Sequence, residues 1–206
     1  MIVNTNSLRL IGTVATDAVY SHICAGEQFY HFTIAVSRQS GTFDNIPVLL
    51  GTCCMGYFMP HSNQMISLEA IIFTTFRNTD GADHLMIYAL AERIALVENN
   101  YGVRNVNWVM LSGAICKRPV IRTTPFGRVI TDMMLAVNRM PGVSYYIPCI
   151  AWGRNAHVAA ILRLGDHVTV EGRVQSRQYQ KKLPDGNVLD KVTYEVSITH
   201  IDKSPL

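Results

Sequence analysis

The strongest constraint on the fold of this chain is an internal repeat. Residues 4–47 and 105–148 align without a gap at a constant offset of 101, and 12 of the 44 aligned positions are identical. Chance would give roughly three identities, so the chain contains a duplicated unit far longer than the repeats of solenoid proteins. The identical pairs include Asn6/Asn107, Gly12/Gly113 and Arg38/Arg139. We therefore expect two domains, residues 1–100 and 101–206, and each copy serves as a control for the other.

Composition limits the class of protein. Hydrophobic residues make up 49% of the 206 residues, which is enough for each copy to bury a core. The sequence shows no apolar run long enough for a membrane span and no secretion signal, so we expect a soluble cytoplasmic protein without membrane contact. The cysteines, whose odd number and spacing do not suit a disulfide framework and favour a reducing compartment, are Cys24, Cys53, Cys54, Cys116 and Cys149.

Charge is divided unequally between the copies. Residues 1–103 hold four arginines, no lysine and eight acids, a net charge of −4. Residues 104–206 hold 14 lysines and arginines and seven acids, a net charge of +7. This asymmetry predicts that only the second copy faces a polyanion, although a difference in charge alone is also compatible with a role in solubility.

The second copy reads as strands nearly throughout. The helix pattern at 155–164 has Asn155 as the expected N-cap and Gly165 as the expected C-cap. The expected strands are 106–115, 120–123, 129–137, 145–152, 167–177 and 191–200. With 120–123 continuing the first strand past Pro119, a helix between the third and fourth of five strands is the order of an OB-fold. We therefore predict an all-β protein of two tandem OB-folds, each a five-stranded Greek-key barrel, with one short helix in the second.

The first copy follows the same plan and then departs from it. Residues 51–63 contain Gly56 and Pro60, which make a poor helix where the second copy has one. Strands are expected again at 64–76 and 84–97, and 98–104 is the expected linker.

The sequence offers little for catalysis. Cys53, Cys54 and His61 do not have the spacing of a tetrahedral zinc site, and adjacent cysteines at a strand end are usually packing residues. The sequence contains neither a glycine-rich phosphate loop nor a serine in a nucleophile elbow. We therefore expect no enzyme, no metal and no cofactor.

Aromatic and basic residues on the outward side of two strands favour binding. Tyr146 and Trp152 share a side of the third strand of the second copy and lie roughly 20 Å apart at about 3.3 Å per residue. The next strand carries Arg173, Arg177 and Tyr179 opposite its valines. Bases stack on rings for about 1–3 kcal/mol each while cations track phosphates. The alternative is that Trp152 is a core residue and Tyr179 an ordinary strand-end tyrosine.

The repeat discriminates between these interpretations. Tyr146 aligns with Asn45, and one extra residue after Pro47 shifts the offset to 102. The remaining pairs are Trp152/Leu50, Arg173/Ile71, Arg177/Thr75 and Tyr179/Arg77. If these rings and arginines were needed by the fold, the first copy should have kept them, so the control favours a binding role in the second.

The second copy also resembles a known family. Its segments 107–113 (NWVMLSG), 135–137 (LAV), 150–154 (IAWGR), 164–173 (LGDHVTVEGR), 175–179 (QSRQY) and 194–196 (YEV) are similar, in order and over about 95 residues, to bacterial single-stranded DNA-binding proteins. The likeness to the related primosomal replication protein is looser. The first copy is recognisable mainly through its match to the second.

The resemblance carries its own implications. The family stacks DNA on aromatic residues, and three such positions fall on Tyr146, Trp152 and Tyr179. A fourth falls near Pro141, where this chain has no ring, which implies weaker binding than that of a typical member. Family members commonly end in an acidic tail that recruits repair enzymes, whereas residues 201–206 hold one acid, so recruitment by that route is not expected. The usual assembly of four OB-folds implies a homodimer, in which the acidic copy serves chiefly in assembly or is degenerate.

The leading hypothesis is a sequence-independent single-stranded DNA-binding protein acting in replication, recombination or repair. Stacking on Tyr146, Trp152 and Tyr179 would combine with phosphate contacts from Arg122, Arg128, Arg139, Arg154, Arg173, Arg177, Lys181 and Lys182. The alternatives are a protein scaffold of primosome type, an RNA-binding OB module, and an enzyme with a metal or cofactor that the sequence does not reveal.

Overall fold

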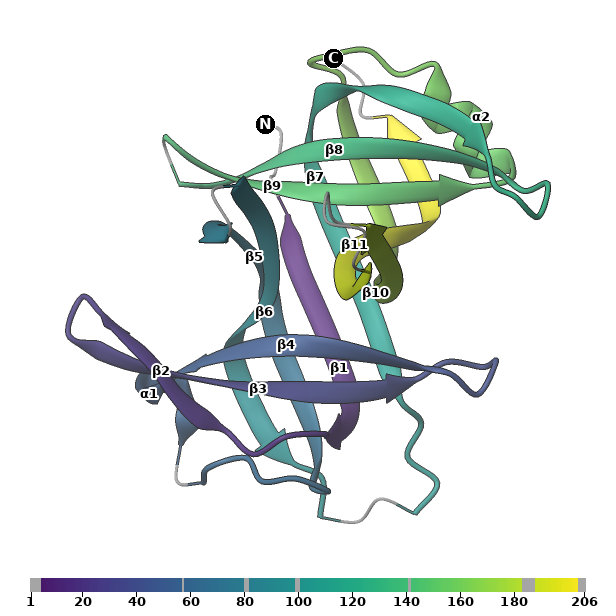
Figure 1. Ribbon diagram of the computed structural model, residues 1–206. Coiled ribbons are helices and arrows are strands. Elements are labelled where there is room, and N and C mark those ends of the chain that lie inside the picture. Colours follow the sequence, from purple (N-terminus) through teal and green to yellow (C-terminus); the bar gives the residue numbers. More distant parts are fainter. Residues whose placement is uncertain are drawn as a thin grey trace.

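The computed structural model describes residues 5–56, 58–79, 82–98, 101–140, 142–182 and 188–203. These residues form two β-barrels, which lie one above the other in Figure 1. The first barrel consists of β1 (Asn6–Val14), β2 (Val19–Cys24), β3 (Glu27–Ser37), β4 (Phe43–Gly51), α1 (Thr52–Met55), β5 (Met65–Thr79) and β6 (Ala82–Leu96). The second consists of β7 (Val106–Thr123), β8 (Val129–Met140), β9 (Val143–Trp152), α2 (Arg154–Ala160), β10 (His167–Lys182) and β11 (Val188–Lys203). No helix in these ranges is long and apolar enough to cross a membrane.

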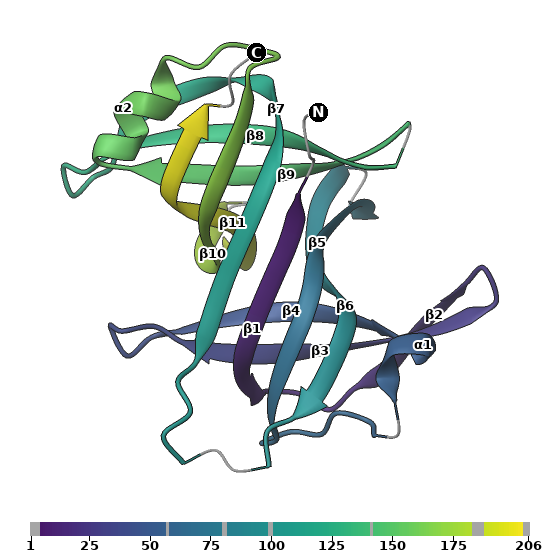
Figure 2. The ribbon, with the colours of Figure 1, turned by 180° about the vertical axis from the view of Figure 1, so that it is seen from behind.

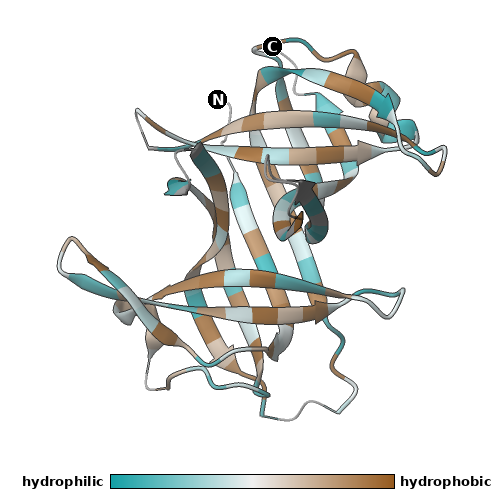
Figure 3. Cartoon of the chain, in the orientation of Figure 1, coloured by the Kyte–Doolittle hydropathy of each residue, from teal (hydrophilic) through white to brown (hydrophobic). Residues whose placement is uncertain are grey.

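Both barrels close in the same way, which confirms the prediction of two tandem OB-folds. β4 runs parallel to β6, and β9 runs parallel to β11, while the neighbouring pairs are antiparallel. Hydrophobic and hydrophilic residues alternate along the strands (Figure 3). The inward residues, such as Ile34 and Val48 in the first barrel and Val137 and Ile147 in the second, form the buried core.

The structure differs from the predicted elements in detail. Residues 106–115 and 120–123 form one strand, β7, because register shifts around Lys117 absorb Pro119 without ending the strand. Helix α2 follows Gly153 at φ 55, and the side chain of Asn155 donates to the carbonyl of Thr199 (2.9 Å) instead of capping the helix. Gly165, the expected C-cap, lies at φ 85 in the turn that follows the helix.

A second helix was not expected but is present in the first copy. Helix α1 is only four residues long and ends at Gly56, which adopts φ 64. The backbone N–H of Cys53 donates to the carboxylate of Glu27 (2.9 Å), so one of the unpaired donors of this turn is satisfied from β3. The glycine and proline that disfavour a longer helix therefore still permit a single turn.

The repeated glycines have a structural cause. A Cβ atom on Gly12 would lie 2.4 Å from the carbonyl oxygen of Ala35, and one on Gly113 would lie 2.5 Å from that of Ala136. Each glycine therefore lets the first strand of its barrel approach the backbone of its neighbour more closely than any side chain would allow.

A repeated asparagine fixes the same strand. Asn6 donates its side-chain N–H to the carbonyl of Ile72 (2.8 Å) and accepts from the N–H of Ile72 (2.9 Å). Asn107 makes the same two bonds to Val174, at 2.7 and 2.9 Å. Each side chain continues a strand ladder where the backbones separate, which explains the identity of the two asparagines.

The two barrels share one continuous sheet. β1 pairs antiparallel with β7 from Asn6 opposite Leu111 to Ile11 opposite Val106, and Figure 2 shows β10, β7, β1 and β5 side by side. Leu8 pairs with Val109, its own equivalent in the repeat. The pairing is therefore symmetric about these two residues, and the copies are related by a local twofold axis.

A second pair of contacts follows this symmetry. The N–H of Asn45 donates to Oγ of Ser176 (3.3 Å), and the N–H of Tyr146 donates to Oγ1 of Thr74 (3.1 Å). The repeat makes Asn45 equivalent to Tyr146 and Thr74 equivalent to Ser176. The backbone of β4 therefore hydrogen-bonds to a side chain of β10, and the backbone of β9 to a side chain of β5.

We predict that Asn107→Ala lowers the free energy of unfolding by about 1–3 kcal/mol, because the N–H and carbonyl of Val174 lose their partner. Asn45→Ala is the control, since Asn45 uses its backbone N–H, which alanine retains, and its side chain is exposed. Urea denaturation followed by circular dichroism measures both. Equal stabilities of the two variants would contradict the role given to Asn107.

Candidate nucleic-acid interface

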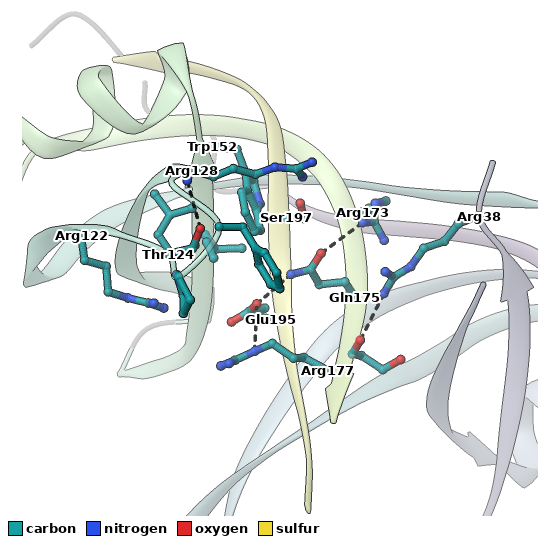
Figure 4. A pocket seen from close by; sticks show the side chains of 15 residues that line it. Arg38, Arg122, Thr124, Arg128, Trp152, Arg173, Gln175, Arg177, Glu195 and Ser197 are labelled. Carbon is teal, nitrogen blue, oxygen red and sulfur yellow. Dashed lines mark hydrogen bonds and ion pairs between the residues drawn. The ribbon is translucent and has the colours of Figure 1, made fainter. Parts of the chain in front are cut away.

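An open groove of about 610 Å³ lies on the second barrel between the β7–β8 hairpin and the outer faces of β9, β10 and β11 (Figure 4). Trp152 stands in it among arginines. The cations that line it are Arg38, Arg122, Arg128, Arg173 and Arg177. All of these except Arg38 were predicted from the sequence.

Trp152 reaches the groove because β9 alternates. Tyr145, Ile147, Cys149 and Ala151 point into the core, which turns Trp152 and the intervening residues outward. Trp152 is half-buried and lines the groove. The alternative that Trp152 is a core residue is therefore not what the structure shows.

Besides Arg38, which pairs with Asp44, three of the arginines in the groove are partly neutralised by acids. Arg122 forms a two-bonded pair with Asp132 (2.5 and 3.1 Å), and this hydrogen bonding raises the pKa of the guanidinium. Arg177 lies 3.9 Å from the carboxylate of Glu195. Arg173 donates to Asp44 (2.6 Å).

Arg128 differs from these three. Within the described part of the chain Arg128 has no ion-pair partner, and its backbone N–H donates to Oγ1 of Thr124 (3.1 Å), which holds the hairpin turn. Its charge is therefore the one most available to a phosphate.

Asp44 organises the side of the groove nearest the first barrel. It is 1% exposed, pairs with Arg38 and Arg173, and accepts the N–H of Ser176 (2.9 Å). Arg38 also donates to the carbonyl of Ser176 (3.1 Å). Burial lowers the pKa of Arg173 and the charge of Arg38 lowers it further, whereas Asp44 raises it. Arginine stays charged at neutral pH through such shifts, so Arg173 has a structural partner as well as a place in the groove.

Three predicted residues lie away from the groove. Tyr146 is 45% exposed and lines a different cavity between the barrels. Arg139 donates to the hydroxyl of Tyr145 (2.7 Å), the arrangement that corresponds to Arg38 with Asp44 in the first copy. Arg154 is exposed at the first residue of α2.

Other predictions fall outside the described side chains. Tyr179, Lys181 and Lys182 continue β10, with backbone pairing to Lys191, Leu189 and Val188, but their side chains are not described. Pro141, the position of the missing family ring, also lies outside the described residues, as do residues 183–187 between β10 and β11.

The sequence reasoning missed two residues that line the groove. Phe126 is 92% exposed at the tip of the β7–β8 hairpin, in the polar segment between two predicted strands. An aromatic residue in a polar turn was the available signal. Arg38 comes from the acidic copy, and no sequence signal connected it with the second barrel.

The cysteine pair of the first barrel has no surrounding ligand set. Sγ of Cys53 lies 3.4 Å from Sγ of Cys54, while His61 lies 3.7 Å from Asp17 instead. Hydrogen bonding to Glu27 raises the pKa of Cys53 to about 12, so the free thiol is protonated at neutral pH. Across the described ranges, no group of three or more His, Cys, Asp or Glu residues could hold a metal ion.

Comparisons with known proteins match this chain to single-stranded DNA-binding proteins. Residues 106–203 match the model of the Single-strand binding protein family. The chain is 36% identical over 84 residues to Single-stranded DNA-binding protein A of Bacillus subtilis, covering 37% of this chain and 49% of that protein. It is 36% identical over 88 residues to the single-stranded DNA-binding protein of Thermus thermophilus, covering 38% and 33%. The match thus spans about half, or less, of these curated relatives.

Solved structures show the same fold over the whole chain. The wild-type single-stranded DNA binding protein of Thermus aquaticus has a TM-score of 0.72 and 22% identity, covering 98% of this chain and 94% of that one. A deletion variant of the same protein gives 0.73 and 23%, covering 100% and 97%. The fold of both copies, including the first, is therefore shared with these structures.

We predict that Asp44→Ala lowers the free energy of unfolding by about 3 kcal/mol, the low end for breaking a buried ion pair, because Arg38 and Arg173 remain partly exposed to water. Asp132→Ala removes the exposed partner of Arg122 and should cost less than about 1 kcal/mol. Denaturant unfolding of the two variants compares them. A larger loss for Asp132→Ala would contradict the central role of Asp44.

Proposed function

We propose that this chain binds single-stranded DNA without sequence preference and acts in replication, recombination or repair. One observation carries the proposal: the ring of Trp152 stands in an open groove lined by five arginines. Sequence-tolerant binding of a single strand needs this combination, because bases stack on an exposed ring while cations follow the phosphates. The relatives named above support the same ligand.

The hairpin over the groove strengthens the contrast between the copies. Under the repeat, Arg122 corresponds to Ser21 and Arg128 to Glu27, so the first barrel replaces two cations by a neutral residue and an acid. Phe126 corresponds to Ala25. The scaffold of the hairpin persists, with Gly26 and Gly127 both at positive φ. Features that the fold does not require are thus concentrated in one copy.

The two halves have different roles in this proposal. Residues 101–206 form the DNA-binding domain, in which Trp152 and Arg128 make the most direct contacts, with Tyr146, Tyr179, Lys181 and Lys182 extending the path. Residues 1–100 form an acidic domain that serves mainly in assembly. It also contributes Arg38, which helps to hold Arg173 beside the groove through Asp44.

We predict that labelled oligo-dT binds the whole chain at low salt, with an affinity that falls as salt rises, because the release of condensed counterions that drives binding becomes less favourable at higher salt. Trp152→Ala should weaken binding about tenfold, the loss of one stacked base. Fluorescence anisotropy of the labelled strand measures both effects. Tyr20→Ala is the control, since Tyr20 is a ring of the first barrel, is 54% exposed and does not line the groove.

Several outcomes separate this proposal from its alternatives. Binding that does not respond to salt, or no binding at all, would exclude it. Equal affinity for duplex DNA would favour a protein scaffold, and tighter binding of poly-U than of poly-dT would favour an RNA-binding module.

We further propose that the chain forms a homodimer with four OB-folds, through the outer face of the shared sheet. Val109 and Leu111 point into the core, so Trp108 and Met110 lie on the outer face, and both are half-buried. Arg9 lies directly opposite Trp108, and Glu171 lies opposite Met110. A central apolar strip flanked by charges of both signs suits a second copy of the same face.

We predict a mass near twice 23.0 kDa by light scattering, and a shift of Met110→Lys toward the monomer, because a lysine would be buried in the interface. Val120→Lys is the control: it lies on the same strand beyond the register shift at Lys117 and is 57% exposed. A monomeric wild-type chain, or equal dissociation of both variants, would contradict this interface.

A further inference from the structure

A second cavity, of about 370 Å³, lies between the two barrels and is separate from the groove. The first barrel contributes Phe76, Asp83 and Leu85 to it, and the second contributes Lys117, Met134 and Tyr146. We propose that this cavity is a nucleobase-binding subsite in which one base of the bound strand stacks between Phe76 and Tyr146. The inference deepens the proposed function and rests on it.

The fold places Phe76 opposite Tyr146. The 15-residue strand β5 extends past the first barrel toward β9 (Figure 1). The ring of Phe73 packs edge-on against that of Tyr145 with centroids 5.5 Å apart, and Thr74 accepts the N–H of Tyr146. Phe76 lies two residues beyond Thr74 and therefore on the same side of the strand. These contacts hold the aromatic end of β5 in place beside β9.

The two rings are available to a ligand. Phe76 is 61% exposed and Tyr146 is 45% exposed. Among the described residues, Phe73 makes a tilted contact with Tyr88 and an edge-on contact with Tyr145, whereas Phe76 and Tyr146 line the same cavity without a ring contact to each other. Two exposed rings that face one space and do not touch leave room for a third flat group between them.

The charges in the cavity favour a base over a phosphate. Lys117 and Asp83 contribute one charge of each sign, and the Asp83 carboxylate accepts a hydrogen bond from Asn78 (2.8 Å). The rest of the wall consists of Leu85, the thiol of Cys116 and the thioether of Met134, and sulfur packs well against aromatic rings. A neutral, flat, polarisable group suits this wall, while Lys117 can meet the adjoining phosphate.

Strand β9 runs between the groove and the cavity. The residues of β9 that alternate with its core residues are Trp152, Ile150, which is 3% exposed, Pro148 and Tyr146, and they span roughly 20 Å at about 3.3 Å per residue. A single strand that stacks on Trp152 and follows this face for several nucleotides therefore arrives at the cavity. Short oligomers that occupy the groove would not reach it.

The symmetric position on the other side lacks these features. Under the repeat, Phe76 corresponds to Gln178, Tyr146 to Asn45 and Lys117 to Thr16. Among the described residues, the aromatic cavity therefore occurs at the contact between β5 and β9 and not at the equivalent contact between β10 and β4. In this inference the acidic copy supplies one wall of a DNA subsite, although its own equivalents of Trp152, Arg122 and Arg128 are Leu50, Ser21 and Glu27.

The test compares Phe76→Ala with the wild-type chain on labelled oligo-dT of about 5 and about 15 nucleotides, which spans the site sizes of OB-folds. We expect the variant to bind the long oligomer about fivefold or more weakly and the short one equally well. Tyr20→Ala is the matched control: Tyr20 is 54% exposed on the same barrel, packs edge-on against Tyr30 and does not line the cavity. Phe76→Tyr, which keeps a ring, should restore wild-type affinity.

Long oligomers with abasic sites at the end that reaches the cavity separate stacking from phosphate contacts. If a base occupies the cavity, the wild-type chain binds these abasic oligomers as weakly as Phe76→Ala binds the intact oligomer. Wild-type affinity of Phe76→Ala at both lengths, while Trp152→Ala still weakens binding, would overturn this inference and leave the proposed function intact. Absence of binding by the wild-type chain would overturn both.

Discussion

The pairing of β1 with β7 is the interaction on which the rest of the structure depends. Six residue pairs, centred on Leu8 and Val109, join two barrels into one sheet and remove the exposed edge that each first strand would otherwise present. The same pairing fixes the angle between the barrels. It therefore brings β4 against β10 and β5 against β9, and these two contacts border the groove and the interdomain cavity.

The contact of β4 with β10 and that of β5 with β9 are equivalent under the repeat but differ in their side chains. On one side a buried carboxylate, Asp44, joins Arg38 to Arg173. On the other side the equivalent of Asp44 is Tyr145, which packs against Phe73 and accepts a hydrogen bond from Arg139. The arginine is the same in both copies while its partner has changed from an anion to a phenol. One contact is consequently polar and adjoins the cationic groove, and the other is aromatic and adjoins the apolar cavity.

The sequence predicted the fold well because the fold depends on short-range patterns. Alternation along single strands gave the inward and outward faces of β9 and β10, and the repeat gave the duplicated barrels. The sequence also predicted five binding residues that the structure brings together around one groove, namely Trp152, Arg122, Arg128, Arg173 and Arg177. It failed where the site depends on contacts between the copies. Nothing in the local pattern links Arg38 or Asp44 to Arg173, since these residues lie more than 120 positions apart and meet only through the β1–β7 pairing. Phe76 was overlooked for the same reason.

The central pairing also bears on how the two halves could become unequal. When identical chains pair about a twofold axis, the same patch serves both sides, so any substitution is made twice and must suit both. Joining the copies in one chain removes that restriction while the intramolecular connection keeps them together at any dilution. Gly12 and Gly113, or Asn6 and Asn107, remain identical because each barrel needs them separately. Arg128 and Glu27 are free to differ, and a charge of either sign can be chosen for one half at no penalty to the other.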